Sequence, residues 1–173
     1  MKKLFLCMVL GLVAEWSLAA EPLWLRDVKI SPDGQQIAFC YKGDIYKVAV
    51  GGGKAVQLTT QESYESSPVW SPDGKRIAFA SNREGGSDVY VMSSEGGPAR
   101  RITFNSASEV PTTFSPDGGY VLFVAAIQDP AASALFPKSS MPELYRVPVE
   151  GGRVEQVLGL SLIHISEPTR QEA

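Results

Sequence analysis

The chain has 173 residues, of which 44% are hydrophobic and 20% are charged. Its 16 basic residues nearly balance its 19 acidic residues, so the formal net charge at pH 7 is only -3. A basic nucleic-acid-binding protein, an acidic disordered chain and a collagen-like chain are disfavoured, and we expect no nucleic-acid partner. The composition is typical of a folded globular protein.

The first twenty residues have the pattern of an export signal. Two lysines precede an apolar run from Leu4 to Ala14, and small residues follow up to Ala20. The run is shorter than the roughly 20 apolar residues that a membrane-spanning helix needs. We therefore predict a signal peptide over residues 1–20, an exported, periplasmic location, and no membrane anchor in the mature chain.

A four-residue sequence, Ser-Pro-Asp-Gly, occurs three times, at residues 31–34, 71–74 and 115–118. Each copy is followed by an apolar strand, an acidic residue that begins a second strand, a glycine pair and a last strand. Proline presets the backbone of a turn, aspartate accepts nearby N–H groups, and glycine adopts positive φ. Because no copy has a nearby base or partner ligands, we interpret all three as structural turns.

Repeats of this length with four strands each are typical of a β-propeller, whose blades pack around a channel. We predict an all-β fold, namely a partial propeller of about three four-stranded antiparallel blades from a larger propeller of six or seven blades. The repeat region is expected at 21–159, with blades at 24–60, 64–104 and 108–159. Six aromatic side chains are expected between the sheets: Trp70, Phe79, Tyr90, Phe114, Phe123 and Tyr145.

Two segments depart from the repeats. The third repeat carries an insertion from Ile127 to Pro142, which we expect either to dock a partner or to cap its own blade. The tail at 160–173 begins Leu-Ser-Leu-Ile-His-Ile-Ser-Glu-Pro-Thr-Arg, which resembles a translated transposase sequencing adapter. We favour a non-native tail over a native last strand. In that case the native chain is expected to continue past Gly159, and His164 is no candidate ligand or base.

Catalytic motifs are missing from residues 21–159. This region has no histidine, no Gly-x-Ser-x-Gly sequence, no phosphate-binding glycine-rich loop and no Cys/His ligand spacing. Cys40 lies in an apolar run and is expected to be a buried, inert thiol. The sequence therefore predicts no catalytic residue, no metal site and no cofactor here, and a segment that binds, gates or scaffolds.

The second repeat resembles a known family. Residues 70–79, Trp-Ser-Pro-Asp-Gly-Lys-Arg-Ile-Ala-Phe, are similar almost residue for residue to TolB-like propeller repeats, and the resemblance covers nearly all of 24–158. It implies a propeller fold, but propellers host many activities. The opening at 24–30 and the insertion segment 128–136 also resemble exported tricorn-like serine proteases.

This second resemblance implies the N-terminal propeller of an exported serine protease, which would admit or filter peptide substrates. One alternative is a TolB-type protein of the Tol-Pal system, which binds envelope proteins. Another is the propeller of a prolyl-oligopeptidase-like dipeptidyl peptidase. TolB-like proteins carry an α/β domain before the propeller, and the first repeat follows the expected cleavage site too closely for one, so we favour the protease. The expected partner is a peptide or protein substrate, or an envelope protein.

Segments that enter the innermost strands would line the channel of a propeller. The binding candidates are Arg26, Asp27, Glu62, Tyr64, Glu65, Ser108 and Glu109. The alternative is that they are solvated loop side chains with no binding role.

Overall fold

The structure is a computed structural model, and it describes residues 24–127 and 142–158. These residues form twelve strands and no helix, so none of them lies in a helix that could cross a membrane. The predicted signal peptide at 1–20, the tail at 160–173 and most of the insertion lie outside the described residues.

The strands form three four-stranded antiparallel sheets, one for each sequence repeat. The first sheet contains β1 (Arg26–Ile30), β2 (Gln36–Tyr41), β3 (Asp44–Ala49) and β4 (Val56–Gln57). The second contains β5 (Glu65–Trp70), β6 (Arg76–Glu84), β7 (Gly86–Ser93) and β8 (Arg100–Arg101). The third contains β9 (Glu109–Phe114), β10 (Tyr120–Ala125), β11 (Glu143–Pro148) and β12 (Glu155–Leu158). Within each sheet the strands are neighbours in chain order, which confirms the predicted all-β fold of four-stranded antiparallel units.

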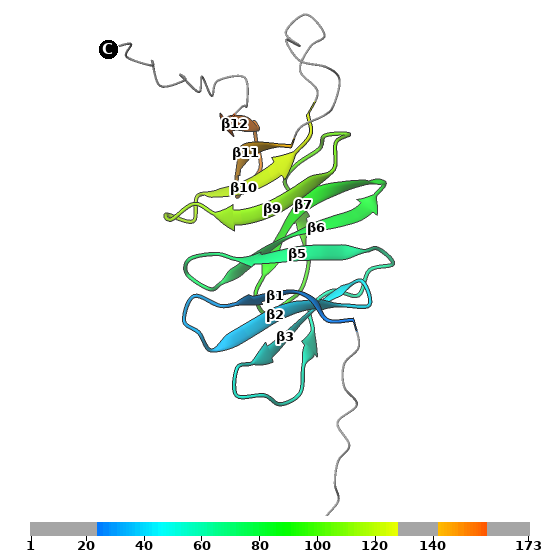
Figure 1. Cartoon of the computed structure of the whole chain (residues 1–173), viewed down its shortest axis with the longest axis vertical. Coiled ribbons are helices and arrows are strands. Elements are labelled where there is room, and N and C mark those ends of the chain that lie inside the picture. Colours follow the sequence, from blue (N-terminus) through cyan, green and yellow to red (C-terminus); the bar gives the residue numbers. More distant parts are fainter. Residues whose placement is uncertain (1–23, 128–141, 159–173) are drawn as a thin grey trace, which may run out of the picture.

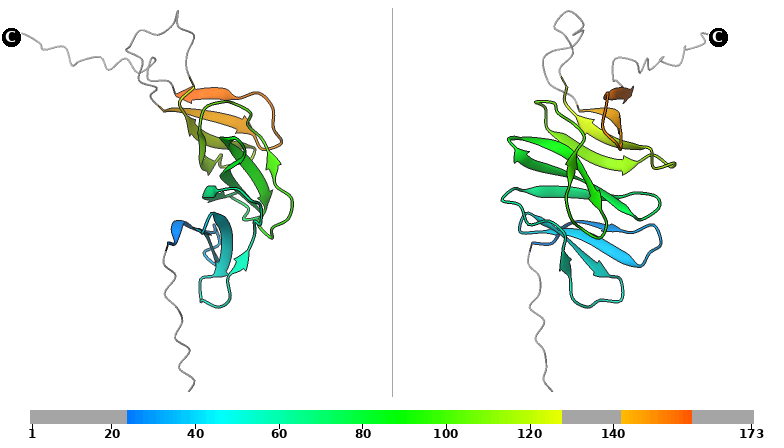
Figure 2. Two further views of the ribbon diagram at one scale, coloured as in Figure 1. Left: turned by 90° about the vertical axis from the view of Figure 1, so that its right-hand side faces the viewer. Right: turned by 180° about the vertical axis from the view of Figure 1, so that it is seen from behind.

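The three sheets follow one another along the long axis of the molecule (Figure 1). After a quarter turn about this vertical axis, the stack of sheets is seen to bend into an arc (Figure 2, left). The first strand of each sheet contacts the first strand of the next, β1 with β5 and β5 with β9. In a propeller the blades converge toward the central channel. The strands β1, β5 and β9 are therefore the inner strands of three consecutive blades.

Each Ser-Pro-Asp-Gly sequence forms the same hydrogen-bonded turn. In the first turn the Ser31 hydroxyl and the Gln35 N–H both donate to the carboxylate of Asp33, and Gly34 has a φ of 70°. The same contacts recur around Asp73 and Asp117. In all three turns the serine hydroxyl is the main cause that lowers the pKa of the aspartate. The interpretation of these sequences as structural turns is confirmed.

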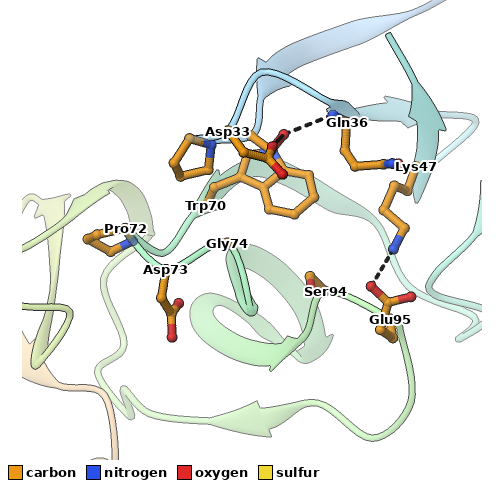
Figure 3. Close-up of a pocket in the computed structure, with 11 residues that line it drawn as sticks. Asp33, Gln36, Lys47, Trp70, Pro72, Asp73, Gly74, Ser94 and Glu95 are labelled. Atoms are coloured by element: carbon orange, nitrogen blue, oxygen red, sulfur yellow. Dashed lines mark hydrogen bonds and ion pairs between the residues drawn. The ribbon is translucent and has the colours of Figure 1, made fainter. Parts of the chain in front are cut away.

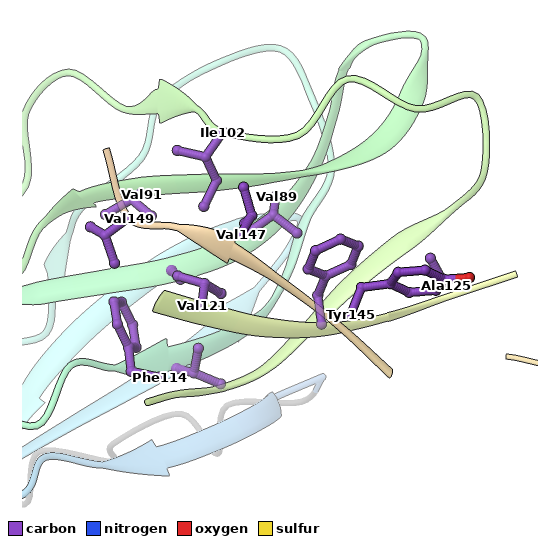
Figure 4. Packing of buried hydrophobic residues seen from close by; sticks show 12 residues of the cluster. Val89, Val91, Ile102, Phe114, Val121, Ala125, Tyr145, Val147 and Val149 are labelled. Atoms are coloured by element: carbon purple, nitrogen blue, oxygen red, sulfur yellow. The ribbon is translucent and has the colours of Figure 1, made fainter. Parts of the chain in front are cut away.

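Two apolar clusters join neighbouring sheets. One spans the first and second sheets and contains Ala38, Cys40, Ile45, Leu58, Ile77, Phe79, Tyr90 and Met92. The other spans the second and third sheets (Figure 4) and includes Ala78, Val89, Val91, Ile102, Phe114, Val121 and Val147. Successive side chains of a strand point to opposite faces, so Ile77 and Phe79 pack toward the first sheet while Ala78 packs toward the third. The middle sheet is therefore covered on both faces.

A phenylalanine and a tyrosine stack across the second and third strands of every sheet. The ring centroids lie 5.8 Å apart in the first sheet, 5.9 Å in the second and 5.7 Å in the third. The three pairs are Phe39 with Tyr46, Phe79 with Tyr90, and Phe123 with Tyr145, each in direct cross-strand register. The register is kept although the strands beyond it end differently. The first sheet turns at 42–43, whereas in the second sheet the two strands continue with a register shift to a turn at Gly85.

Five of the six aromatic side chains expected between the sheets are buried. The exception is Trp70, which is half-buried at the end of β5. Ile30, which occupies the same place in the first repeat, is 60% exposed. Cys40 is buried, and burial is the main cause that raises the pKa of its thiol to about 12, which confirms the expected unreactive cysteine.

Candidate functional site

The candidate residues lie at the starts of the inner strands or in the segments that lead into them. Glu65 pairs with Ser81 of β6, which in turn pairs with Asp88 at the start of β7. Glu109 pairs with Ala125, at the corresponding end of the third sheet. One end of each sheet therefore carries all of these residues. We call this end, defined by Arg26, Tyr64, Glu65 and Glu109, the strand-entry face.

Polar contacts cross between the first and second blades at this face. The Arg26 guanidinium donates to the hydroxyl of Tyr64 over 3.3 Å, and the backbone N–H of Ser67 donates to Asp27 over 2.9 Å. Asp27 and Ser67 both have left-handed backbone, with φ of 50° and 52°, at the bulge of β1 and the bulge of β5. The same bulge thus aims polar groups from two consecutive inner strands at one another. Tyr64 is 47% exposed, so part of its ring remains open to a ligand.

Glu65 is fully buried and hydrogen-bonded. Its carboxylate accepts from the hydroxyls of Ser63 and Ser81 and from the guanidinium of Arg83, which lies 3.0 Å away. The Arg83 guanidinium also lies over the rings of Tyr90 and Phe79, at 4.5 and 5.6 Å from the centroids. The alternative of a solvated loop side chain is therefore wrong for Glu65, which is held inside the second blade as part of an ion pair.

Glu109 occupies the same position in the third blade and is also fully buried. The residues that partner Glu65 are replaced there by Ala107, Ala125 and Ile127, and neither carboxylate oxygen of Glu109 accepts a hydrogen bond of normal geometry from a described residue. Burial is the main cause that raises the pKa of Glu109 to about 7. Asp88 adds to the rise, while the nearby Thr103 hydroxyl and Arg101 oppose it. Glu109 is not a solvated side chain either.

The remaining two candidates, Glu62 and Ser108, are exposed in the loops that precede β5 and β9. The structure brings Arg26, Asp27 and Tyr64 together at the first blade junction. It places no hydrogen bond or ion pair between either loop residue and another described side chain. The exposed part of the strand-entry face thus offers a guanidinium, a phenol and carboxylates, which suit hydrogen bonding to a peptide.

Sequence reasoning missed a polar pair that recurs beside these residues. An acidic residue near the start of the third strand bonds a side chain of the fourth strand in every sheet: Asp44 with Gln57, Asp88 with Arg101, and Glu143 with Gln156. In each case the fourth-strand residue stands opposite the tyrosine two positions after the acidic residue. In the first two sheets a threonine lies two residues after this fourth-strand side chain, and its hydroxyl accepts the backbone N–H of the residue that follows the acidic one. Thr59 accepts from Ile45 in this way, and Thr103 accepts from Val89 over 2.8 Å. The fixed spacing of acidic residue and threonine in the repeats was the signal that could have revealed these contacts.

No three His, Cys, Asp or Glu side chains in the ranges 24–127 and 142–158 are arranged to hold a metal ion. The carboxylate of Glu65 joins the start of β5 to Ser81 and Arg83 of β6.

Three sheets that pack through their inner strands define a repeat protein of the β-propeller class, a scaffold with polar strand ends gathered at one face. The chain belongs to the family of tricorn protease N-terminal β-propeller domains, which it matches over residues 22–164.

Individual relatives are similar over parts of their length. The chain is 36% identical over 73 residues to dipeptidyl-peptidase 5 of Porphyromonas gingivalis, a match that covers 36% of the chain and 10% of that protein. A TolB structure from Agrobacterium tumefaciens is 28% identical with a TM-score of 0.63, over 78% of the chain and 48% of TolB. A tricorn protease structure is similar in fold alone, at 14% identity and a TM-score of 0.54, over 72% of the chain and 13% of the protease. The chain thus spans about a tenth of the curated relative and less than half of either solved structure.

Proposed function

We propose that this propeller is the N-terminal part of an exported, tricorn-like serine protease, in which it admits or filters peptide substrates. The observation that carries the proposal is membership in the tricorn protease N-terminal propeller family. In this function the propeller supplies recognition, and the catalytic groups belong to another region of the protease. Export rests on the signal-peptide pattern of residues 1–20.

The geometry of the strand-entry face supports a role in peptide selection. Arg26 and Tyr64 come from different blades, meet at 3.3 Å and keep exposed surface. A guanidinium and a phenol can both donate to the carbonyl groups of an extended peptide, and the phenol ring adds apolar contact. Beneath them the ion pair of Glu65 and Arg83 fixes the start of the inner strand of the second blade, so Tyr64 next to it is held in place while a peptide passes.

The test uses the intact protein that carries this propeller, assayed with a mixture of peptides of different length and charge. We expect hydrolysis that a serine-directed reagent stops. We also expect Arg26→Ala and Tyr64→Ala to change which peptides are cleaved, without changing cleavage of a very short peptide that needs no gate. Lys54→Ala, which removes an exposed charge from the opposite end of the first blade, is the matched control. Unchanged peptide preference in both variants would contradict selection at the strand-entry face.

Two other functions each have an observation in their favour. The 28% identity to TolB favours a periplasmic propeller that binds envelope proteins of the Tol-Pal type. The 36% identity to a dipeptidyl peptidase favours a propeller in front of a prolyl-oligopeptidase-like hydrolase. An intact protein without peptidase activity that forms a stable complex with an envelope protein would support the first. Release of dipeptides from peptide N-termini would support the second.

A further inference from the structure

The two blade junctions differ at the end of the sheets opposite the strand-entry face, where consecutive Ser-Pro-Asp-Gly turns meet. The turns themselves are placed alike. A Cβ atom on Gly74 would lie 4.0 Å from the Pro32 ring, and one on Gly118 would lie 3.7 Å from the Pro72 ring. The two junctions can therefore be compared position by position.

At the junction of the second and third blades, an arginine fills the space between the turns. The guanidinium of Arg76 donates to the carbonyl of Gly118 over 3.2 Å. It also lies 3.8 Å from the carboxylate of Glu150, which is bound on its other side by Arg100 at 2.7 Å. This junction shows which chemical group the space between two turns accepts: a guanidinium that meets a turn carbonyl and a carboxylate.

At the junction of the first and second blades, the position of Arg76 is taken by Gln36. Gln36 is shorter and uncharged, and its side chain donates to no described residue. A pocket of about 210 Å³ occurs here, and its lining includes Gln36, Trp70 and Gly74. Figure 3 shows the Trp70 ring between the turns of Asp33 and Gly74. The pocket thus lies where the next junction holds its arginine.

The charge of the pocket suits a cation. Three carboxylates line it, those of Asp33, Asp73 and Glu95, against one ammonium, that of Lys47. Hydrogen bonds within the turns, first of all from the serine hydroxyls, hold the pKa of Asp33 and of Asp73 below the usual range, so both stay ionised at neutral pH. Lys47 is already bound to Glu95 at 2.8 Å (Figure 3). The indole of Trp70 adds a flat aromatic wall on which a guanidinium can stack.

We propose that this pocket binds the arginine side chain of a peptide or protein. The ligand guanidinium takes the place that Arg76 fills one blade later, donating to the carbonyl of Gly74 and lying against Trp70. Guanidinium groups are planar and present several donors, so they match this combination better than a lysine ammonium does. The site lies at the other end of the sheets from the strand-entry face, so it does not depend on peptide selection there.

The experiment measures binding of N-acetyl-arginine amide to the full chain by titration, with Trp70 fluorescence as the signal. N-acetyl-citrulline amide, which has the same shape without the charge, is the control probe. We expect saturable binding of the arginine probe to one site and none of the citrulline probe. Equal responses to the two probes, or none to either, would overturn the proposal.

Two variants give each junction the residue that the other junction has at the equivalent position, Gln36 or Arg76. Gln36→Arg supplies the guanidinium from the chain itself, and we expect it to abolish binding of the probe. Arg76→Gln empties the second junction, where Phe114 takes the place of Trp70, so calorimetric titration replaces fluorescence for this variant, and we expect it to count two arginine sites instead of one. Circular dichroism checks that each variant is folded. Should either variant fail to fold, Asp73→Asn, which removes one pocket charge, is expected to weaken binding, and unweakened binding would count against the site.

Discussion

Glu65 and Glu109 show how one position in a repeat can hold the same residue in two different surroundings. Both are fully buried at the start of an inner strand. Glu65 is bound by Arg83 and two serines, whereas the raised pKa of about 7 means that Glu109 is half protonated near neutral pH. A buried carboxyl without a cation is less costly when it is neutral.

This difference gives a pH-dependent stability. The pKa of Glu109 rises from 4.5 in the unfolded chain to about 7 in the folded one, so the folded state binds the proton more tightly. Its contribution to stability is therefore fully present below pH 4.5 and is lost as the pH rises through 7. Glu109→Gln should remove this loss and stabilise the protein at pH 8 by about 1–2 kcal/mol, less than the full shift gives because the charge is partly screened. Urea unfolding at pH 5 and pH 8 measures the effect.

Glu65→Gln is the matched control for this prediction. It breaks the ion pair with Arg83, so we expect lower stability at both pH values. The groups that face Glu109 are Asp88, Arg101 and Thr103, and none of them changes in either variant. A Glu109→Gln protein with the same stability as the unmodified protein at pH 8 would show that the buried carboxyl carries no cost.

Burial of these carboxylates could not be predicted from the sequence. A glutamate that follows a polar loop is exposed in most proteins, and here it is the neighbouring strands that cover it. The cation that distinguishes the two sites, Arg83, stands on the hairpin of the same blade, eighteen residues along the chain. The sequence indicated that the candidates lie at or just before the starts of the inner strands, but their partners depend on packing.

The Ser-Pro-Asp-Gly turns are the elements that the sequence predicts best. Their hydrogen bonds join residues no more than five positions apart, so local chemistry determines them. The last strand of each repeat is predicted less well by the sequence, because in the first sheet it is only the two residues Val56–Gln57. Beyond it the hydroxyl of Thr59, instead of a backbone group, accepts the N–H of Ile45, so the ladder ends in a side-chain contact.

A pair of glycine variants tests the turn. Gly34 has a φ of +70° and Gly51 has no positive φ, and a Cβ atom on either would meet nothing within 4 Å. We therefore expect Gly34→Ala to destabilise the protein by about 1 kcal/mol, because alanine is strained in left-handed backbone. Gly51→Ala should be neutral or slightly stabilising because it restricts only the unfolded chain. Thermal melting of both variants measures the difference, and equal melting temperatures would exclude backbone strain as the reason for glycine in the turn.

At the scale of the whole molecule, stability depends on contacts between blades. Each apolar cluster contains residues of two sheets, and the middle sheet takes part in both clusters. The repeat length predicted stacked sheets, because each sheet has apolar residues on both faces. The pocket at the first junction could not be predicted, because it depends on how far apart two turns lie once the sheets have packed.

Equivalent phenylalanines test this arrangement. Phe79 is fully buried between the first and second sheets, whereas Phe39 is only partly buried on the first. We expect Phe79→Ala to lower the free energy of unfolding by about 3–5 kcal/mol, as for other buried aromatic residues. Phe39→Ala should cost clearly less because water already reaches part of the ring. Urea unfolding of the two variants measures both losses, and similar losses would mean that packing between the sheets adds little.

The stacked phenylalanine and tyrosine of each sheet also have a practical consequence. They keep the second and third strands in register while the strands beyond them turn at 42–43 in one blade and, after a register shift, at Gly85 in the next. A foreign peptide grafted between Tyr41 and Asp44 would therefore leave the pairing of these two strands intact, because the stack that sets the register lies deeper in the sheet. The graft has to keep Gly43, whose carbonyl accepts the backbone N–H of Glu65 over 2.7 Å. The hairpins of this propeller are a natural place to display new sequences, and blades with hairpins of different lengths could be combined in one scaffold.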